Sequence, residues 1–174
     1  MTRWLRFLAA LVAARGRSKL SITDESELSF RAWPTECDAV FMNNASFLTL
    51  CEAARLDFMV RSGLFAVARK RGWFLPMAAV HVQFLRPVKR LAEVKVLSRV
   101  AAWSGDAVWV EQKVMSGGKL AAVVIERGVF KDGRRTLPAD EVVGLVWPGT
   151  APREPSPWLE KLAASDAELR DALR

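Results

Sequence analysis

The chain has 174 residues, of which 51% are hydrophobic and 26% are charged, so length and composition predict one folded domain with terminal additions and exclude a disordered chain. The formal charge of +7 favours an anionic partner, such as an acidic membrane surface, a phosphate-rich small molecule or nucleic acid. Cys37 and Cys51 are too few for a disulfide scaffold and lack metal-ligand spacing, so we expect reduced thiols and no bound metal.

Residues 1–27 are predicted to form a basic amphipathic helix followed by a connection. The apolar core of the helix, residues 7–14, is too short to span a bilayer. The expected helix has an apolar face of Trp4, Phe7, Leu8, Leu11 and Val12 and a basic face of Arg3, Arg6 and Arg17. Residues 4–15 would then either contact an anionic membrane surface or pack on the protein's own domain or a partner subunit.

The next predicted elements are a strand, an acidic loop and the longest helix of the chain. Residues 28–34 alternate as in a strand that ends at Pro34, and Glu36 and Asp38 follow in the loop. The helix extends to Gly63, and its apolar residues recur at intervals of three and four: Phe47, Leu50, Cys51, Ala54 and Phe58. This face is wide enough to predict a mostly buried helix.

The start of this helix is the first candidate for chemistry. Asn43, Asn44 or Ser46 can cap it, because a short side-chain oxygen accepts hydrogen bonds from the amide groups of the first turn. With Asp38 nearby, the amide groups and the positive dipole end of the helix are suited to polarise a carbonyl and activate a water. The alternative interpretation is a capped helix that only packs the core.

From Met77 onward, apolar residues recur at every second position, as in a strand, instead of at the spacing of three and four that is typical of a helix. Four strands are predicted over residues 77–87, 92–102, 107–115 and 119–130. Because no helices intervene and the later turns are short, we expect antiparallel pairing. Together with the early strand, these segments predict an α+β fold in which a five-stranded antiparallel sheet curves around the long central helix.

Accessory elements are expected on both sides of these strands. Residues 64–73 indicate a short basic helix that is broken by Gly72, and the end of the chain indicates a proline-rich linker and a C-terminal helix. The predicted regions are an N-terminal helix and connection (1–27), the domain of sheet and central helix (28–147) and the linker with the C-terminal helix (148–174).

A series of short motifs follows the same chain order as these elements: Asp38 in the loop, the pair Asn43 and Asn44, Phe47, Glu52-Ala53-Ala54-Arg55, and Phe84-Leu85-Arg86-Pro87. In this order they resemble the hot-dog fold, specifically the 4-hydroxybenzoyl-CoA-thioesterase-like branch of the acyl-CoA thioesterases. The resemblance covers roughly residues 28–135.

The resemblance implies thioester hydrolysis without a cofactor. Asp38 would be the catalytic carboxylate, acting as general base on a water or as nucleophile, together with Asn43 and Asn44. The substrate's carbonyl would lie at the helix start, where the backbone of Ala45, Ser46 and Phe47 polarises it.

The resemblance also implies a substrate and an assembly. Acyl-CoA or an acyl-carrier thioester would bind at the interface of a homodimer, with its phosphates held by basic groups. Arg86, Lys89 and Arg90 are the expected phosphate ligands, with Arg69 and Lys70 as further candidates.

The chain departs from the family pattern in the loop itself. Relatives commonly have Asp-x-x-Gly-His-x-Asn-Asn, whereas this chain reads DAVFMNN from Asp38 to Asn44, one residue shorter and without the glycine and histidine. Asp38 would then either still reach the helix start or belong to a protein that binds an acyl ligand without hydrolysing it. Glu52, on the helix, is the fallback carboxylate, and its alternative role is an ion pair with Arg55.

Other chemistries are disfavoured. His81, the only histidine, alternates opposite to Val80 and Val82, so we expect a sheet-face side chain rather than a base. Cys37 adjoins Asp38, whose charge would raise the pKa of the thiol and make it a poor nucleophile. No interleaving of arginine and aromatic residues marks a nucleic-acid surface. The expected location is the cytoplasm, with peripheral contact to a membrane as the alternative.

Overall fold

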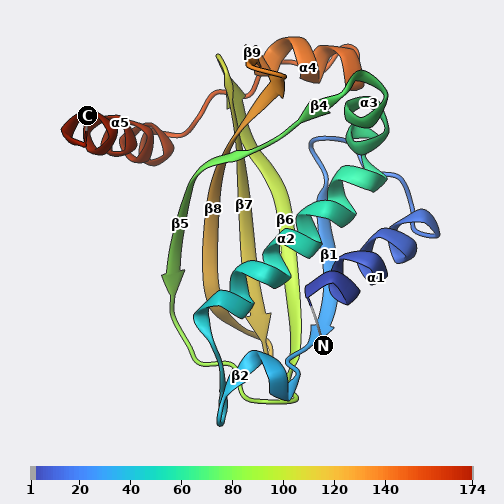
Figure 1. The fold of residues 1–174 in the computed structure, drawn as a ribbon, viewed down its shortest axis with the longest axis vertical. Coiled ribbons are helices and arrows are strands. Elements are labelled where there is room, and N and C mark those ends of the chain that lie inside the picture. Colours follow the sequence, from blue (N-terminus) through green and yellow to red (C-terminus); the bar gives the residue numbers. More distant parts are fainter. Residues whose placement is uncertain (1–2, 174) are drawn as a thin grey trace.

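The computed structural model describes residues 3–173, in which a sheet curves around one long helix (Figure 1). Residues 1, 2 and 174 of the predicted terminal regions, and the side chain of Arg3, lie outside the described part. The helices are α1 (Arg3–Arg15), the 3-10 turn η1 (Pro34–Glu36), α2 (Asn44–Arg61), α3 (Leu64–Arg71), α4 (Ala139–Val146) and α5 (Pro157–Ala172). Among the described helices, none has the length and apolar character needed to cross a membrane.

The main sheet has seven strands and is antiparallel throughout. Its order is β1-β6-β7-β8, and β4, β5 and β9 all pair with β8, while β2 and β3 form a separate hairpin. The strands are β1 (Glu25–Arg31), β2 (Cys37–Asp38), β3 (Phe41–Met42), β4 (Trp73–Phe74), β5 (Met77–Phe84), β6 (Glu93–Ser104), β7 (Ala107–Ser116), β8 (Lys119–Asp132) and β9 (Arg135–Leu137). The five long strands, β1 and β5 to β8, are those that the sequence predicts.

β1 begins and ends three residues earlier than the predicted strand at residues 28–34. Its ladder with β6 runs from the pair Glu25 and Arg99 to the pair Arg31 and Glu93. Pro34 therefore opens η1 instead of ending the strand. The predicted bounds are wrong because pairing with β6, rather than local alternation, decides where this strand lies.

α2 crosses the concave face of the sheet, as Figure 1 shows. Of the three predicted caps the structure uses Asn43, whose Oδ1 accepts the N–H of Ser46 at 2.9 Å. Gly63 follows the helix with φ of 84°, a left-handed conformation that suits glycine. The helix packs on valines of the sheet through buried residues that include Phe47, Leu50, Cys51 and Ala54. This arrangement confirms the predicted hot-dog fold.

α3 and α4 cover one end of the sheet. α3 ends at Gly72, as predicted, where φ is 71°. Val142 and Val143 of α4 belong to a second core cluster that also contains Phe58 of α2 and Trp103 of β6. The fold therefore has a hydrophobic core at both ends of α2.

α1 packs against α2, and its Arg6 faces inward. Arg6 is buried and donates to both carboxylate oxygens of Glu36, at 2.7 and 2.5 Å. Ala10 and Ala14 are buried beside it. The exposed residues of the helix include Trp4, Leu5, Leu8 and Val12, which belong to its apolar side. Phe7 and Leu11 of the predicted apolar face are half-buried, whereas Trp4, Leu8 and Val12 are exposed, so the face packs only in part on the protein's own domain and both predicted alternatives stay open.

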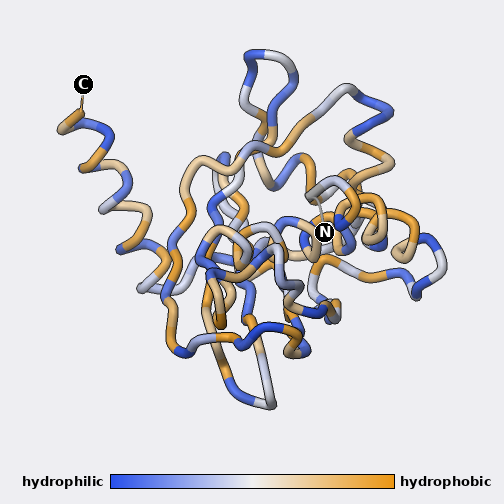
Figure 2. The backbone as a smooth tube through the Cα atoms, turned by 60° about the horizontal axis from the view of Figure 1, so that its bottom comes forward, coloured by the Kyte–Doolittle hydropathy of each residue, from blue (hydrophilic) through white to orange (hydrophobic). Residues whose placement is uncertain are grey.

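α5 lies on the outer face of the sheet, away from α2. Its Leu159 packs on Trp109 and Ile125. His81 of β5 also faces this side, with its Nε2 3.1 Å from Asp166 Oδ1, which confirms a sheet-face histidine. The C-terminal half of α5 extends away from the rest of the molecule (Figures 1 and 2). The division of the chain at residues 27 and 147 stays a prediction.

Candidate functional site

The start of α2 carries backbone donors that the helix itself does not use. The first amide groups of a helix have no acceptor within it. Asn43 accepts the N–H of Ser46, and its own N–H donates to Glu36 O at 3.0 Å, which holds the helix start against the preceding loop. The N–H groups of Asn44 and Ala45, both exposed residues, have no acceptor inside the helix. Unused amide groups at a helix start are suited to donate hydrogen bonds to an anion or a carbonyl oxygen.

Asp38 lies at the tip of the β2–β3 hairpin. It pairs with Phe41 across a two-residue turn of Ala39 and Val40. Ala39 has φ of 58°, in the left-handed region that is uncommon for residues other than glycine. The Asp38 side chain is exposed, and within residues 3–173 it makes no hydrogen bond or ion pair. The carboxylate is therefore available to a substrate or a water.

The hairpin is joined to the segment that follows β5. The N–H of Met42 donates to Val88 O and the N–H of Arg90 donates to Val40 O, both at 2.8 Å. Lys89 forms a β-bridge within the same contact. These backbone hydrogen bonds hold Asp38 and the basic segment at residues 86–90 at one end of the molecule.

The end of β5 contacts the first turn of α2. The rings of Phe47 and Phe84 meet edge to face, with centroids 5.3 Å apart. After β5, the N–H of Arg86 donates to Ala121 O at 3.0 Å, and its Nη1 donates to Leu120 O at 2.7 Å. Arg86 is therefore oriented by the backbone of β8, while the aromatic pair provides an apolar wall next to the helix start.

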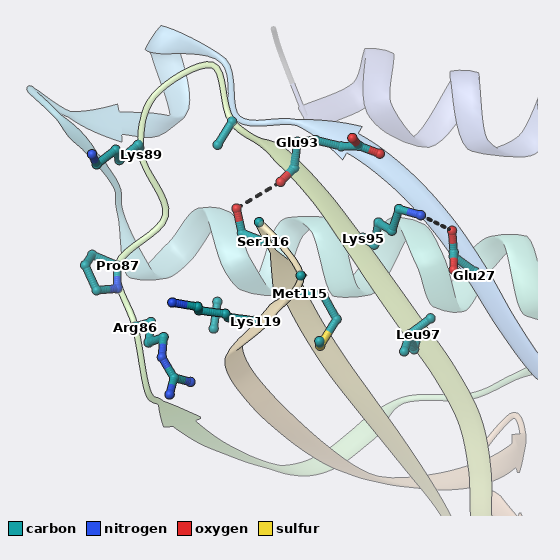
Figure 3. Close-up of a pocket in the computed structure, with 14 residues that line it drawn as sticks. Glu27, Arg86, Pro87, Lys89, Glu93, Lys95, Leu97, Met115, Ser116 and Lys119 are labelled. Atoms are coloured by element: carbon teal, nitrogen blue, oxygen red, sulfur yellow. Dashed lines mark hydrogen bonds and ion pairs between the residues drawn. The ribbon is translucent and has the colours of Figure 1, made fainter.

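A pocket of about 890 Å³ lies beside this basic segment (Figure 3). Its charged lining residues are Arg86, Lys89, Lys95, Lys119, Glu27 and Glu93. Lys95 pairs with Glu27 at 3.0 Å. The remaining three cations face one carboxylate, so the pocket favours an anion. Lys95 and Lys119 lie far from the predicted basic segment in the sequence, and only the pairing of β6, β7 and β8 brings them to it.

The fallback carboxylate lies away from this site. Glu52 is nine residues beyond Asn43, roughly 13 Å along the helix axis. Arg55 forms an ion pair with the buried Glu126 of β8. The expected pairing of Glu52 with Arg55 stays a prediction.

Two further basic candidates are also distant. Arg69 and Lys70 lie on α3, beyond the far end of α2, which is roughly 27 Å long. The predicted residues that the structure brings to one end of the molecule are Asp38, Asn43, Asn44, Ala45, Ser46, Phe47, Arg86, Lys89 and Arg90. Their roles in catalysis and binding remain predictions.

The cysteines and the histidine do not form a nucleophilic pair. Burial raises the pKa of the Cys37 thiol, and the charges of Glu36 and Asp38 add to the rise, as the sequence predicts for Asp38. Burial also raises the pKa of Cys51, which lies inside the core. His81 faces α5 on the other side of the sheet. Both cysteines are free thiols in environments that disfavour the reactive thiolate.

The chain is similar in sequence to proteins that are described as thioesterases. A model of the thioesterase-like superfamily matches residues 32–164. A protein of Saccharomyces cerevisiae described as a probable thioesterase is 25% identical over 116 residues, which cover 64% of this chain and 50% of the yeast protein. The chain therefore spans about half the length of that relative.

Two crystal structures from Thermus thermophilus share the fold. A hypothetical protein is 26% identical with a TM-score of 0.63, covering 71% of this chain and 98% of its own. A thioesterase from the same species, complexed with coenzyme A and Zn, is 24% identical with a TM-score of 0.61, covering 69% of this chain and 89% of its own. Each likeness therefore covers about seven tenths of this chain.

Proposed function

The chain belongs to the thioesterase-like superfamily, and on that premise we propose that it hydrolyses the thioester bond of an acyl-CoA at the start of α2. The observation that carries the proposal is the position of Asp38. An exposed and unpaired carboxylate lies on a hairpin whose backbone is bonded to the basic segment after β5. The same hairpin leads directly into Asn43, the cap of α2.

The reaction uses Asp38 as general base toward a water or as nucleophile on the thioester carbonyl. The carbonyl oxygen becomes an oxyanion, which the N–H groups of Asn44 and Ala45 stabilise. The tetrahedral intermediate then breaks its carbon–sulfur bond, and the coenzyme A thiolate leaves and takes a proton. When Asp38 acts as nucleophile, water hydrolyses the resulting anhydride. The Phe47 and Phe84 pair lines the path of the acyl group.

Arg86, Lys89 and Lys119 bind the phosphates of the coenzyme A nucleotide in this proposal. Clustered guanidinium and ammonium groups supply the charge-assisted hydrogen bonds that phosphates need. The pocket of about 890 Å³ is large enough for a nucleotide. Support also comes from the structurally similar thioesterase that is complexed with coenzyme A.

The proposal includes a homodimer, for which the edge of the sheet at β5 gives support. Among the described strands, β5 pairs with β8 alone. Val80, Phe84 and Leu85 are exposed at this edge. A second copy that paired along β5 would cover these side chains and the unpaired backbone groups. We place the protein in the cytoplasm, with contact to a membrane surface through residues 4–15.

A second candidate function is binding of an acyl ligand without turnover. The hairpin at Asp38 favours it, because Ala39 adopts a left-handed conformation in a loop that is one residue shorter than the family pattern. A carboxylate held by such a turn can lie out of reach of the thioester carbonyl.

Thiol release from a series of acyl-CoA esters of increasing chain length tests the proposal. We expect turnover of at least one ester, and a higher KM for the matching acyl-pantetheine, which lacks the nucleotide. The double variant Arg86→Gln with Lys119→Gln should raise the KM for acyl-CoA and leave the KM for acyl-pantetheine unchanged. Lys70→Gln, on α3, should change neither of these KM values. Tight binding of acyl-CoA without thiol release would support the second candidate and contradict hydrolysis.

A further inference from the structure

α1 is attached to the domain by an arginine and two alanines. Arg6 is 4% exposed, and its Nη2 donates to Arg31 O at 2.6 Å in addition to the paired Glu36. Ala10 and Ala14, four and eight positions further on, face the same side. The helix cannot rotate to bury its other side without leaving both charges of a buried ion pair without partners.

The opposite side of α1 exposes large apolar side chains. Trp4 is 81% exposed, Val12 58%, Leu8 57% and Leu5 52%. Positions 4, 8 and 12 lie one above another on a helix, so these residues form one stripe, which we name the α1 surface. Single exposed apolar residues are ordinary, but four on one helix of 13 residues mark a contact surface.

A groove of about 580 Å³ adjoins the α1 surface, between α1, α2 and α3. Its lining is mainly apolar, with Phe7, Leu11, Leu56, Met59 and Phe65, and also contains the charged residues Glu52 and Arg55. Trp4 and Leu8 line the groove as well as forming the stripe, so stripe and groove are continuous. Figure 2 shows α1 as a largely hydrophobic coil at the edge of the molecule.

Positive charges border the α1 surface. Arg15 is exposed at its C-terminal end. Phe65 lines the groove from α3, and Arg69 follows four positions later on the same helix face, next to the exposed Lys70 and Arg71. A second copy of the chain, bound through a two-fold axis, would bring these cations against one another. An anionic lipid surface complements them, in agreement with the formal charge of +7.

We propose that α1 docks the protein on an anionic lipid bilayer, with Trp4, Leu5, Leu8 and Val12 inserted at the boundary of headgroups and acyl chains. Arg15 and the cations of α3 contact the lipid phosphates. An amphipathic helix that lies in the interface binds through apolar area and through attraction to anionic lipid, which are the two features combined here. The docking is independent of the proposed hydrolysis, since none of these residues belongs to the site at the start of α2.

Cosedimentation of the full chain with vesicles tests the proposal. The parent should bind vesicles of phosphatidylcholine with phosphatidylserine, and should bind pure phosphatidylcholine more weakly. Leu8→Glu should reduce the bound fraction at least about tenfold, because it replaces inserted apolar area with a charge. Leu169→Glu is the matched control, since Leu169 is 61% exposed on the distant α5, and this variant should bind as the parent does.

The charged border is tested separately. Arg69→Gln with Lys70→Gln should weaken binding to anionic vesicles and leave binding to neutral vesicles unchanged. Thermal unfolding should be the same for all variants, because each changed side chain is exposed. Failure of the parent to bind anionic vesicles, or equal binding of Leu8→Glu and parent, would overturn the proposal. A lower molecular mass of Leu8→Glu in solution without lipid would also overturn it, in favour of a second copy as the occupant.

Discussion

Two neighbouring segments, η1 and the β2–β3 hairpin, each carry a carboxylate, and the two carboxylates have opposite surroundings. Glu36 is buried, paired with Arg6, and also accepts the N–H of Trp33 at 3.0 Å. Asp38, two residues later, is exposed and has no partner in the described chain. A buried and fully bonded carboxylate contributes to the fold, whereas an open one is free to react. Sequence position alone does not distinguish these roles.

Asp38→Asn is expected to have the largest effect. Replacing the carboxylate with an amide of the same shape removes the base or nucleophile, and general base catalysis contributes about 10²- to 10⁴-fold. We expect kcat for the best acyl-CoA ester to fall by about a thousandfold, measured by thiol release. The thermal unfolding midpoint should not change, because the side chain is exposed. An Asp38→Asn variant as active as the parent would exclude Asp38 from the chemistry.

Glu36→Gln, in contrast to Asp38→Asn, should lower the stability of the fold. It leaves the buried guanidinium of Arg6 without its counter-charge, and breaking a buried pair costs about 3–5 kcal/mol. The free energy of unfolding, measured in urea, should fall by about that amount. The double variant Arg6→Met with Glu36→Gln should recover part of the loss. Full stability in the single variant would show that the ion pair does not hold α1 to the domain.

Asn43→Ala probes the residue that links the two segments to α2. It removes the side-chain acceptor for the N–H of Ser46, a capping bond worth about 1 kcal/mol. We expect that loss in chemical denaturation, together with reduced turnover. Asn43→Ser restores a capping oxygen and should recover stability, so an Asn43→Ser variant that is stable but inactive would assign the Asn43 amide a further role in the reaction.

Ala39→Gly should stabilise the hairpin by up to about 1 kcal/mol, since a left-handed residue with a Cβ is strained by about that amount. Val40→Gly is the matched control, because Val40 has no positive φ, and it should destabilise. The thermal unfolding midpoint should rise for Ala39→Gly and fall for Val40→Gly. If Ala39→Gly also raises kcat, the hairpin conformation limits the position of Asp38.

The smallest expected effect concerns the reactivity of the Cys37 thiol, which lies between the two carboxylates in the sequence. Burial raises the pKa of its thiol, followed by the effect of Glu36, so its thiolate forms at a higher pH than that of an ordinary thiol. Because the folded pKa is the higher one, the thiol's contribution to stability is complete below the unfolded pKa and is lost as pH rises through the folded value. Alkylation followed by mass spectrometry should show slower modification of Cys37 in the folded than in the unfolded chain at about pH 8, near the ordinary thiol pKa. Equal rates would contradict the raised pKa.

The local spacing of apolar residues and the positions of glycines were sufficient to predict most of the helices and strands. Apolar spacing of three and four predicted α2, alternation predicted the long strands after Met77, and Gly63 and Gly72 marked helix ends that the structure confirms. The cap at Asn43 was among the predicted candidates. These features depend on backbone preferences and on neighbours a few residues apart, which a sequence displays directly.

The sequence by itself determined the fold, the family resemblance and the residues at the start of α2. Only the tertiary structure decided which side of α1 faces inward, because the partner of Arg6 lies 30 residues away at Glu36. It also decided that Lys119 joins Arg86 in the pocket, and that His81 meets Asp166 on α5. Periodicity reports which residues share a face of one element. Which face is buried depends on charges and strands far away in the chain, and these meet only when the sheet has formed around α2.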